Sequence, residues 1–470
     1  MKFEKSNLQP IPQPRFKLPF LGHLHYLKNG IQEGFIEFTE KLGPIYRLKL
    51  GPHNMIVVAG LEFLRELGND TKFTKYLGPA AKDLRKAFSG GFGFLSTDDP
   101  AWKKINRLIL PGFQQKAIEE NYFPIMKSVL TKMFSKWDNA PEKNKINLNS
   151  ELGRLVLDTV GLCEFRYDFR SIFLDKPHPL PEAIDKIFLL SIKRMVLPEF
   201  VDKLFFRQRK EFQHTLAILH KYSDEILEAR RKSSNSTPDY KDFLHLLMYE
   251  AERATGEKFD DKFLMSQIYV LLFASIGSST SLLVVSFYAL MTHPEVLEKA
   301  YKEIDNVLGT DPNKPITVGN FARLVYIRQI LNESLRLWQP VAFIERTPIE
   351  DIILQEKYLI KKGEGVSAIV SFVHHDKALW GEDADSFNPD RFAPMLHAKR
   401  DPYAFLPFGF GLRACIGRQF ALFQSTVILT LILHKYRLHL KSDKIDNAKV
   451  RMDNLPALWV TLEKRNMLSL

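Results

Sequence analysis

The chain has 470 residues, of which 45% are hydrophobic and 26% charged, so it can form a large globular core. Only two cysteines occur, which excludes a secreted disulfide scaffold and favours a reducing compartment, and we expect a cytoplasmic protein. The formal net charge of +11 suits an acidic protein partner, whereas no nucleic-acid-binding motif accompanies it.

A proline-punctuated segment opens the chain, and a β-hairpin is the first regular structure that the sequence predicts with clear boundaries. The first twenty residues hold four prolines and no long apolar run, so we expect no signal peptide and no transmembrane anchor. Residues 45–50 and 55–58 alternate in polarity around Gly51 and Pro52, which predicts two strands joined by a turn.

The middle of the chain is predicted to be helical. Trp102 opens one helix, and residues 116–257 keep a helical pattern with no linker long enough to divide a domain. We therefore expect a single domain over residues 1–470. Cys163 lies in an apolar helical stretch and is predicted to be a packing residue.

Residues 263–292 contain no charge, and this run is the second informative stretch. An apolar run beyond about 18 residues usually indicates a transmembrane helix. Its middle, however, holds Ser275, Gly277, Ser278, Ser279, Thr280 and Ser281, which are too polar for a lipid-facing centre. We predict a buried helix of about 45 Å, at 1.5 Å per residue, that crosses the core.

One face of this helix carries small residues. Ala274, Gly277, Ser278 and Ser281 recur at helical spacing and therefore share a face, whereas Thr280 lies about 200° from Ser278 at 100° per residue. Only one of the two hydroxyls can face a group on a given side of the helix.

A carboxylate and two guanidinium groups follow. Glu333 and Arg336 lie one helical turn apart, a spacing that is most often a solvated surface pair, and Arg391 lies in the segment 387–392.

The stretch 407–417 predicts a tight loop that presents a sulfur. Gly409 and Gly411 permit backbone angles that a Cβ would block, and the apolar run after Cys415 predicts a helix beginning there. We expect the helix N-terminus and Arg413 to lower the pKa of the Cys415 thiol. A thiolate is a metal ligand.

This loop resembles the haem-ligating loop of the cytochrome P450 family, which runs Phe, two spaced glycines, Arg or His, then Cys and a Gly two further on. The matching residues are Phe408, Gly409, Gly411, Arg413, Cys415 and Gly417. The resemblance implies a mainly α fold with small β-sheets and a long central helix over a non-covalently bound haem b, whose iron Cys415 ligates. Within the family, the sequence most resembles the soluble bacterial fatty-acid hydroxylase haem domains.

The resemblance also implies roles for residues outside the loop. Trp102 matches a tryptophan that contacts a haem propionate, and the position four residues on, where the family has a basic residue, is Asn106. Lys75 and Arg346 resemble further propionate-binding residues. Glu333, Arg336 and Arg391 resemble the buried Glu-Arg-Arg cluster, which is structural.

Two departures from the family concern the catalytic side. In the long helix, the family's small residue corresponds to Ala274, its acidic residue to Gly277 and its alcohol residue to Ser278. An alternative register of the same motif places the alcohol residue at Thr280. We expect Ser278 to be the alcohol, in a proton relay that lacks its acid. In the hairpin, we expect His53 and Val57 where the fatty-acid hydroxylases carry an Arg and a Tyr for the substrate carboxylate.

The implied function is a haem-thiolate monooxygenase that hydroxylates an apolar small molecule, such as a fatty acid or terpenoid, with O2. The chain ends at Leu470 without a fused reductase, so the expected electron donor is an acidic ferredoxin, a flavodoxin or a separate flavin reductase. We expect the donor to dock on basic residues around the loop, namely Lys103, Lys104, Arg107, Arg413 and Arg418. The alternatives are a peroxide-dependent peroxygenase or hydroperoxide-rearranging enzyme, and a non-catalytic haem-thiolate sensor.

Overall fold

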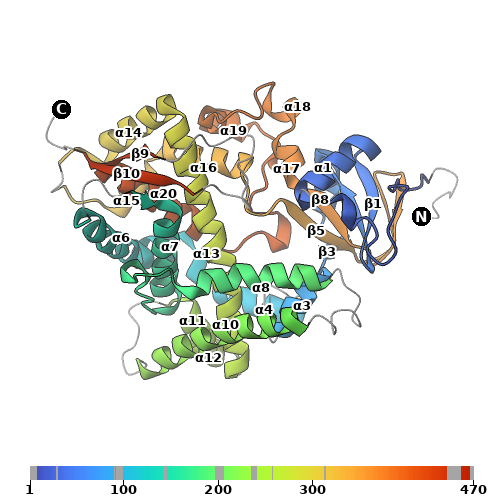
Figure 1. Ribbon diagram of the computed structural model, residues 1–470, viewed down its shortest axis with the longest axis horizontal. Coiled ribbons are helices and arrows are strands. Elements are labelled where there is room, and N and C mark those ends of the chain that lie inside the picture. Colours follow the sequence, from blue (N-terminus) through green and yellow to red (C-terminus); the bar gives the residue numbers. More distant parts are fainter. Residues whose placement is uncertain are drawn as a thin grey trace.

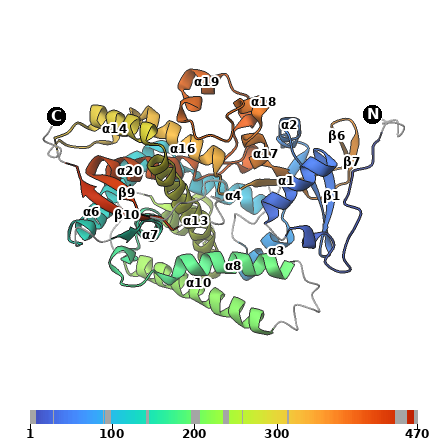
Figure 2. The same cartoon turned by 45° about the horizontal axis from the view of Figure 1, so that its top comes forward.

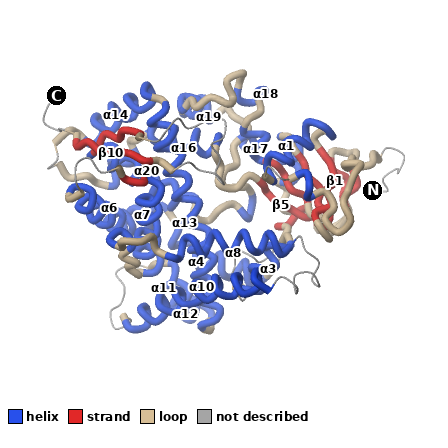
Figure 3. The backbone as a smooth tube through the Cα atoms, viewed as in Figure 1, coloured by secondary structure: helices blue, strands red, loops and turns tan. Residues whose placement is uncertain are grey.

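A computed structural model describes residues 8–27, 30–88, 90, 99–140, 145–195, 206–233, 241–256, 258–311, 314–441 and 457–465. Helices make up most of these residues, and the strands form small sheets at two sides of the helical body (Figures 1 and 3). The predicted class, mainly α with small β-sheets, is confirmed.

The helices follow one another along the whole chain. They are α1 (Ile31–Leu42), α2 (Leu61–Leu67), α3 (Pro79–Ala87), α4 (Pro100–Ile109), α5 (Gln115–Ala117), α6 (Phe123–Asp138), α7 (Leu148–Phe165), α8 (Pro179–Met195), α10 (Phe206–Lys232), α11 (Phe243–His245), α12 (Ala251–Thr255), α13 (Asp261–Thr292), α14 (Pro294–Leu308), α15 (Val318–Ala322), α16 (Val325–Leu337), α17 (Val370–His374), α18 (Lys377–Trp380), α19 (Pro394–Ala398) and α20 (Arg418–Lys435).

Several helices begin where the sequence supplies a side-chain cap. Asp99 accepts the N–H of Ala101 at the start of α4, and Asp260 accepts the N–H of Phe263 at the start of α13. Such caps satisfy backbone donors that have no partner within the helix. Pro294 ends the pattern of α13 and opens α14, since its ring has no N–H to continue the helix.

Helix α13 passes through the middle of the molecule (Figure 2). Of the described helices it alone is long and apolar enough to cross a membrane, but 61% of its most apolar stretch is buried inside the protein. The prediction of a buried core helix is therefore confirmed, because α7, α8, α10, α16 and α20 pack against it.

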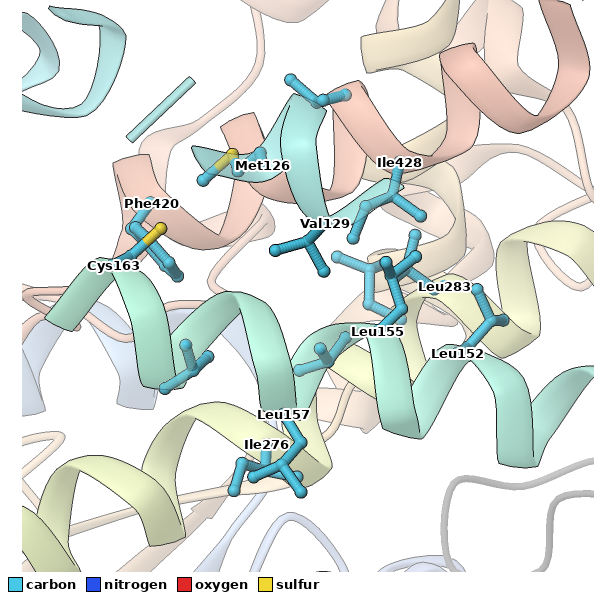
Figure 4. Close-up of a cluster of buried hydrophobic side chains, with 14 of the residues drawn as sticks. Met126, Val129, Leu152, Leu155, Leu157, Cys163, Ile276, Leu283, Phe420 and Ile428 are labelled. Atoms are coloured by element: carbon cyan, nitrogen blue, oxygen red, sulfur yellow. The ribbon is translucent and has the colours of Figure 1, made fainter. Parts of the chain in front are cut away.

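The main core lies between α6, α7, α13 and α20, which contribute apolar side chains to one continuous cluster (Figure 4). Cys163 of α7 is fully buried in this cluster, as predicted for a packing residue. Labelled members include Met126, Val129, Leu152, Leu155, Leu157, Ile276, Leu283, Phe420 and Ile428.

The larger sheet has five strands in the order β1-β2-β8-β5-β3. They are β1 (Ile45–Leu50), β2 (His53–Val58), β3 (Phe73–Lys75), β5 (Phe343–Pro348) and β8 (Val366–Ile369). The predicted hairpin is confirmed, since β1 and β2 pair antiparallel with Ile45 opposite Val58. Strand β2 also pairs parallel with β8, and β3 pairs with β5 so that Lys75 lies opposite Arg346.

Two smaller sheets complete the fold. One contains β4 (Ile146–Asn147), β10 (Trp459–Lys464) and β9 (Tyr436–Leu440), and the other contains β6 (Ile352–Leu354) and β7 (Tyr358–Ile360). Strand β4 lies within residues 116–257, for which the sequence predicts a helical pattern, and its two residues are too few to give a strand pattern in the sequence.

Candidate active site

A cavity of about 2380 Å³ lies between the loop that contains Cys415, the middle of α13, α8 and strand β5. This volume exceeds the roughly 300–1,000 Å³ of a typical small-molecule pocket, so it can hold a large planar cofactor together with a substrate. All the predicted cofactor-binding residues line this one cavity, namely Lys75, Trp102, Asn106, Arg346, Phe408, Arg413, Cys415 and Gly417.

The loop presents the Cys415 sulfur to the cavity, as the glycine pattern predicts. The N–H of Cys415 donates to the carbonyl of Phe408 at 2.8 Å, which closes the loop. Gly409 and Gly411 have φ angles of +71° and +64°, in the left-handed region where a side chain is strained. A Cβ on Gly417 would lie only 3.9 Å from the Cys415 sulfur.

The expectation that the pKa of the Cys415 thiol is lowered is wrong. Burial raises the pKa of Cys415, and this effect outweighs the backbone N–H groups of Gly417 and Arg418 and the charge of Arg418, which all lower it. Arg413 is not among the groups that shift this pKa, and its guanidinium lies over the Trp102 ring, 4.7 Å from the ring centre. A bound metal cation would favour the thiolate directly.

Asp70, which the sequence analysis missed, connects the loop to strand β5. Its carboxylate accepts a hydrogen bond from Arg346 at 2.6 Å and another from the N–H of Leu412 at 2.8 Å. A Cβ on Gly411 would overlap this carboxylate. Gly411 is therefore needed both for its backbone angle and for the space that Asp70 occupies.

Three cations gather at the cavity wall formed by β3, β5 and the loop. Burial and the charge of Arg413 lower the pKa of Lys75 to about 7, and burial and the charge of Arg346 lower the pKa of Arg413 to about 10. Nearby Glu345 is also buried, which raises the pKa of its carboxyl to about 6 despite the charge of Lys75. Crowded, desolvated cations of this kind are stabilised by added negative charge.

The residues present therefore fit haem, whose propionate carboxylates would supply that charge. The Nε of Arg346 is buried and has no hydrogen-bond partner among the described residues. Asn106 lines the cavity but Arg107 does not, so Asn106 is the better placed of the two for a cofactor contact.

Helix α13 turns the predicted face toward the cavity. Ala274, Gly277, Ser278 and Ser281 line it, whereas Thr280 does not. The Ser278 hydroxyl donates to the carbonyl of Ala274 at 2.7 Å. The Thr280 hydroxyl is buried with no hydrogen-bond partner among the described residues, and its methyl group lies on the side of α7.

The structure brings Glu333, Arg336 and Arg391 together in a buried cluster behind the loop. Arg336 donates two hydrogen bonds to Glu333, at 2.7 and 2.8 Å, and Arg391 lies 3.4 Å from the same carboxylate. Arg336 also donates to the carbonyl of His374, whose ring accepts the N–H of Leu406 at 3.0 Å. Leu406 directly precedes the segment 407–417, so the cluster is connected to the loop.

His53 and Val57, which we expect at the positions of the Arg and Tyr of the fatty-acid hydroxylases, do not line the cavity, and Val57 is fully buried. The hairpin residues that line it are Leu50 and Met55, and Met55 lies on the same face of β2 as His53 and Val57, two residues to either side. The hairpin therefore offers the cavity an apolar surface.

Fold and cavity together define a haem-thiolate class of protein, with a cysteine loop on one side of the cofactor cavity and a long helix along it. A sequence profile of the family described as Cytochrome P450 matches residues 12–468. The chain belongs to the cytochrome P450 family, whose cofactor is haem b.

The chain is also similar to proteins that combine a cytochrome P450 with an NADPH–P450 reductase. A bifunctional cytochrome P450/NADPH–P450 reductase of Bacillus cereus is 35% identical over 92% of this chain and 40% of its own length. Bifunctional cytochrome P450/NADPH–P450 reductase 1 of Bacillus subtilis is 35% identical over 91% of this chain and 40% of its own length. A bifunctional cytochrome P450/NADPH–P450 reductase of Gibberella moniliformis is 31% identical over 92% of this chain and 38% of its own length. The chain thus spans about two fifths of the length of these relatives.

Proposed function

We propose that residues 1–470 form one haem domain of a monooxygenase that hydroxylates an apolar small molecule. The observation that carries this proposal is the cavity in which the Cys415 sulfur and the small-residue face of α13 meet. When bound there, thiolate-ligated haem supplies oxygen activation, since the sulfur donates electron density that favours cleavage of the O–O bond.

The residues of the chain have separate tasks in this reaction. Cys415 would hold the iron, and Lys75, Arg346 and Arg413 would bind the carboxylates of the cofactor. Ala274 and Gly277 leave room for oxygen and substrate beside α13. Ser278 would pass protons to the site by its hydroxyl and water, because Gly277 has no acidic side chain.

The reaction also needs electrons, and the proposed donor is an acidic ferredoxin, a flavodoxin or a flavin reductase. The printed names of the relatives combine a cytochrome P450 with an NADPH–P450 reductase, which supports a flavin reductase as one source. Cys163 and Cys415 are both free thiols, which supports a reducing compartment such as the cytoplasm.

The Cys415→His variant tests the proposal. The wild-type reduced carbonyl complex should absorb near the wavelength that names the family, and Cys415→His should lose this absorption while still binding haem through imidazole. A Cys415→His protein with the wild-type spectrum would remove the basis of the proposal. Turnover of the wild type with peroxide alone, but not with reductase and NADPH, would instead favour the peroxygenase alternative.

A further inference from the structure

Asp185 of α8 places a carboxylate on an otherwise apolar wall of the cavity. The described residues of α8 that line the cavity are Ile184, Asp185, Phe188, Leu189 and Ile192. Their spacing puts them on one side of the helix, where α8 crosses near α13 (Figure 1). Asp185 is the charged member of this set.

Within the described part of the chain, Asp185 has no hydrogen-bond or ion-pair partner. Of the basic residues of its helix, Lys186 pairs with Glu211 at 2.8 Å, Arg194 lies 3.5 Å from Asp83, and Lys193 is exposed and does not line the cavity. Partial desolvation at the cavity wall raises the pKa of Asp185, with no neighbouring charge to oppose it. The side chain is nevertheless exposed where it lines the cavity, so it is accessible to a ligand there.

The carboxylate of Asp185 reaches the central part of α13. An ideal Cβ on Gly277 would lie 3.9 Å from Asp185 Oδ1. The absence of a side chain at Gly277 therefore leaves this carboxylate open to the cavity beside Ser278. The Phe188 and Phe273 rings, with centres 5.6 Å apart, also line this part of the cavity.

The other charges of the cavity do not favour an anionic substrate. Of the cations that line it, Lys75, Arg346 and Arg413 belong to the cluster assigned to the cofactor, and Lys377 pairs with Glu382 at 3.3 Å. The hairpin contributes only Leu50 and Met55 to the lining. Helix α1 adds further carboxylates to the lining, those of Glu33, Glu37 and Glu40.

We propose that Asp185 recognises a positively charged nitrogen, a substituted ammonium group, on an otherwise apolar substrate. The proposal deepens the proposed function and rests on it, because the ligand would lie in the same cavity beside α13. A carboxylate and the faces of two aromatic rings are the groups that bind an ammonium ion, through charge and through cation–π attraction.

Calorimetric binding of three ten-carbon probes to the haem-loaded protein tests this assignment. The probes are decyltrimethylammonium, 1-decanol and decanoate, which differ in charge at one end of the same chain. The quaternary nitrogen has no lone pair and cannot ligate iron. We expect the cation to bind about tenfold or more tightly than decanoate, and Asp185→Asn to weaken the cation about tenfold without changing 1-decanol.

Two further variants separate recognition from general charge and folding effects. Glu182→Gln removes one negative charge from the same helix at an exposed position outside the cavity lining, and it should leave the affinities of all three probes unchanged. Asp185→Lys should reverse the preference toward decanoate.

Wild-type affinities for all three probes in Asp185→Asn would overturn the assignment. The same result combined with less product per NADPH would overturn it in favour of proton transfer by Asp185. The carbonyl spectrum of the same protein samples reports separately on the haem-thiolate site, so a failure of substrate recognition is distinguishable from a failure of the proposed function.

Discussion

Lys75 is the residue whose charge depends most directly on the cofactor. It lies opposite Arg346 in the β3–β5 pair and close to Arg413, and burial among these cations lowers its pKa to about 7. Between pH 7 and its ordinary value of 10.5, the unfolded chain therefore binds more protons than the folded haem-free protein. The carboxylates of the cofactor would return the pKa toward its ordinary range.

The Lys75→Met variant tests this linkage. For the haem-free protein we expect the free energy of unfolding to rise with pH above about 7, because the folded-state pKa is depressed, and Lys75→Met should remove most of that rise. Urea unfolding at several pH values measures it. The raised pKa of Glu345, about 6, acts in the opposite sense, lowering stability as pH rises from 4.5 to 6, and Lys75→Met should extend this fall to higher pH because the charge of Lys75 lowers that pKa. A rise above pH 7 that is equal in both proteins would contradict the assignment.

Among the individual site residues, those that could be predicted from the sequence belong to a local pattern or to the family resemblance. Cys415 and its glycines lie within one short loop, so their spacing alone predicts how they lie together. Asp70 and Asp185 carry no such pattern. Each reaches the site from a distant segment through tertiary packing, and neither its type nor its spacing distinguishes it from a surface carboxylate.

Among the elements, α13 divides its hydroxyl groups between two environments. Ser278 lies along the cavity, whereas Thr280 faces α7 with its hydroxyl buried and unpaired among the described residues. This difference follows from the 100° step of the helix, which the sequence shows directly.

We predict that Ser278→Ala lowers product per NADPH and raises peroxide release, since a proton-transfer step typically contributes about 10²- to 10⁴-fold. Thr280→Val should leave both quantities unchanged. It should also leave thermal stability equal or higher, because it replaces a buried unpaired hydroxyl by a methyl group of the same shape. If Thr280→Val lowered the product per NADPH while Ser278→Ala kept the wild-type ratio, the proton relay would be assigned to Thr280 instead.

For the whole molecule, the basic surface around the cysteine loop is the proposed docking site for the electron donor. Lys103 and Arg107 of α4 and Arg418 of α20 are exposed there, beside exposed Leu110 and Leu412. Arg413, which we expected to belong to this surface, turns inward to Trp102 instead.

Reduction by an acidic donor should slow as salt rises, because exposed charges are screened beyond about 8 Å at physiological ionic strength. Lys103→Glu/Lys104→Glu should slow reduction further, as measured by stopped-flow spectroscopy of the carbonyl complex. The control variant Lys361→Glu/Lys362→Glu changes the net charge by the same amount at exposed positions after β7. It should be reduced by the donor at the wild-type rate. Equal rates in both variants at every salt concentration would exclude this surface.

The fold class, the hairpin and α13 could be predicted because each depends on residues close in sequence. The five-stranded sheet could not, since it joins β3 with β5 and β2 with β8 across most of the chain. Short strands such as Phe73–Lys75 have too few residues to show a period, and only their distant partners define them.

The pairing of β2 with β8 also constrains how the protein can be made. Ile56 pairs with Val366, about 310 residues later, so at about 5–20 residues per second the ribosome completes β8 roughly 15 to 60 s after β2. During that time the β1–β2 hairpin has an open edge with unpaired N–H and C=O groups. Nascent chains of this protein should therefore need a chaperone while the first hairpin waits for its partner.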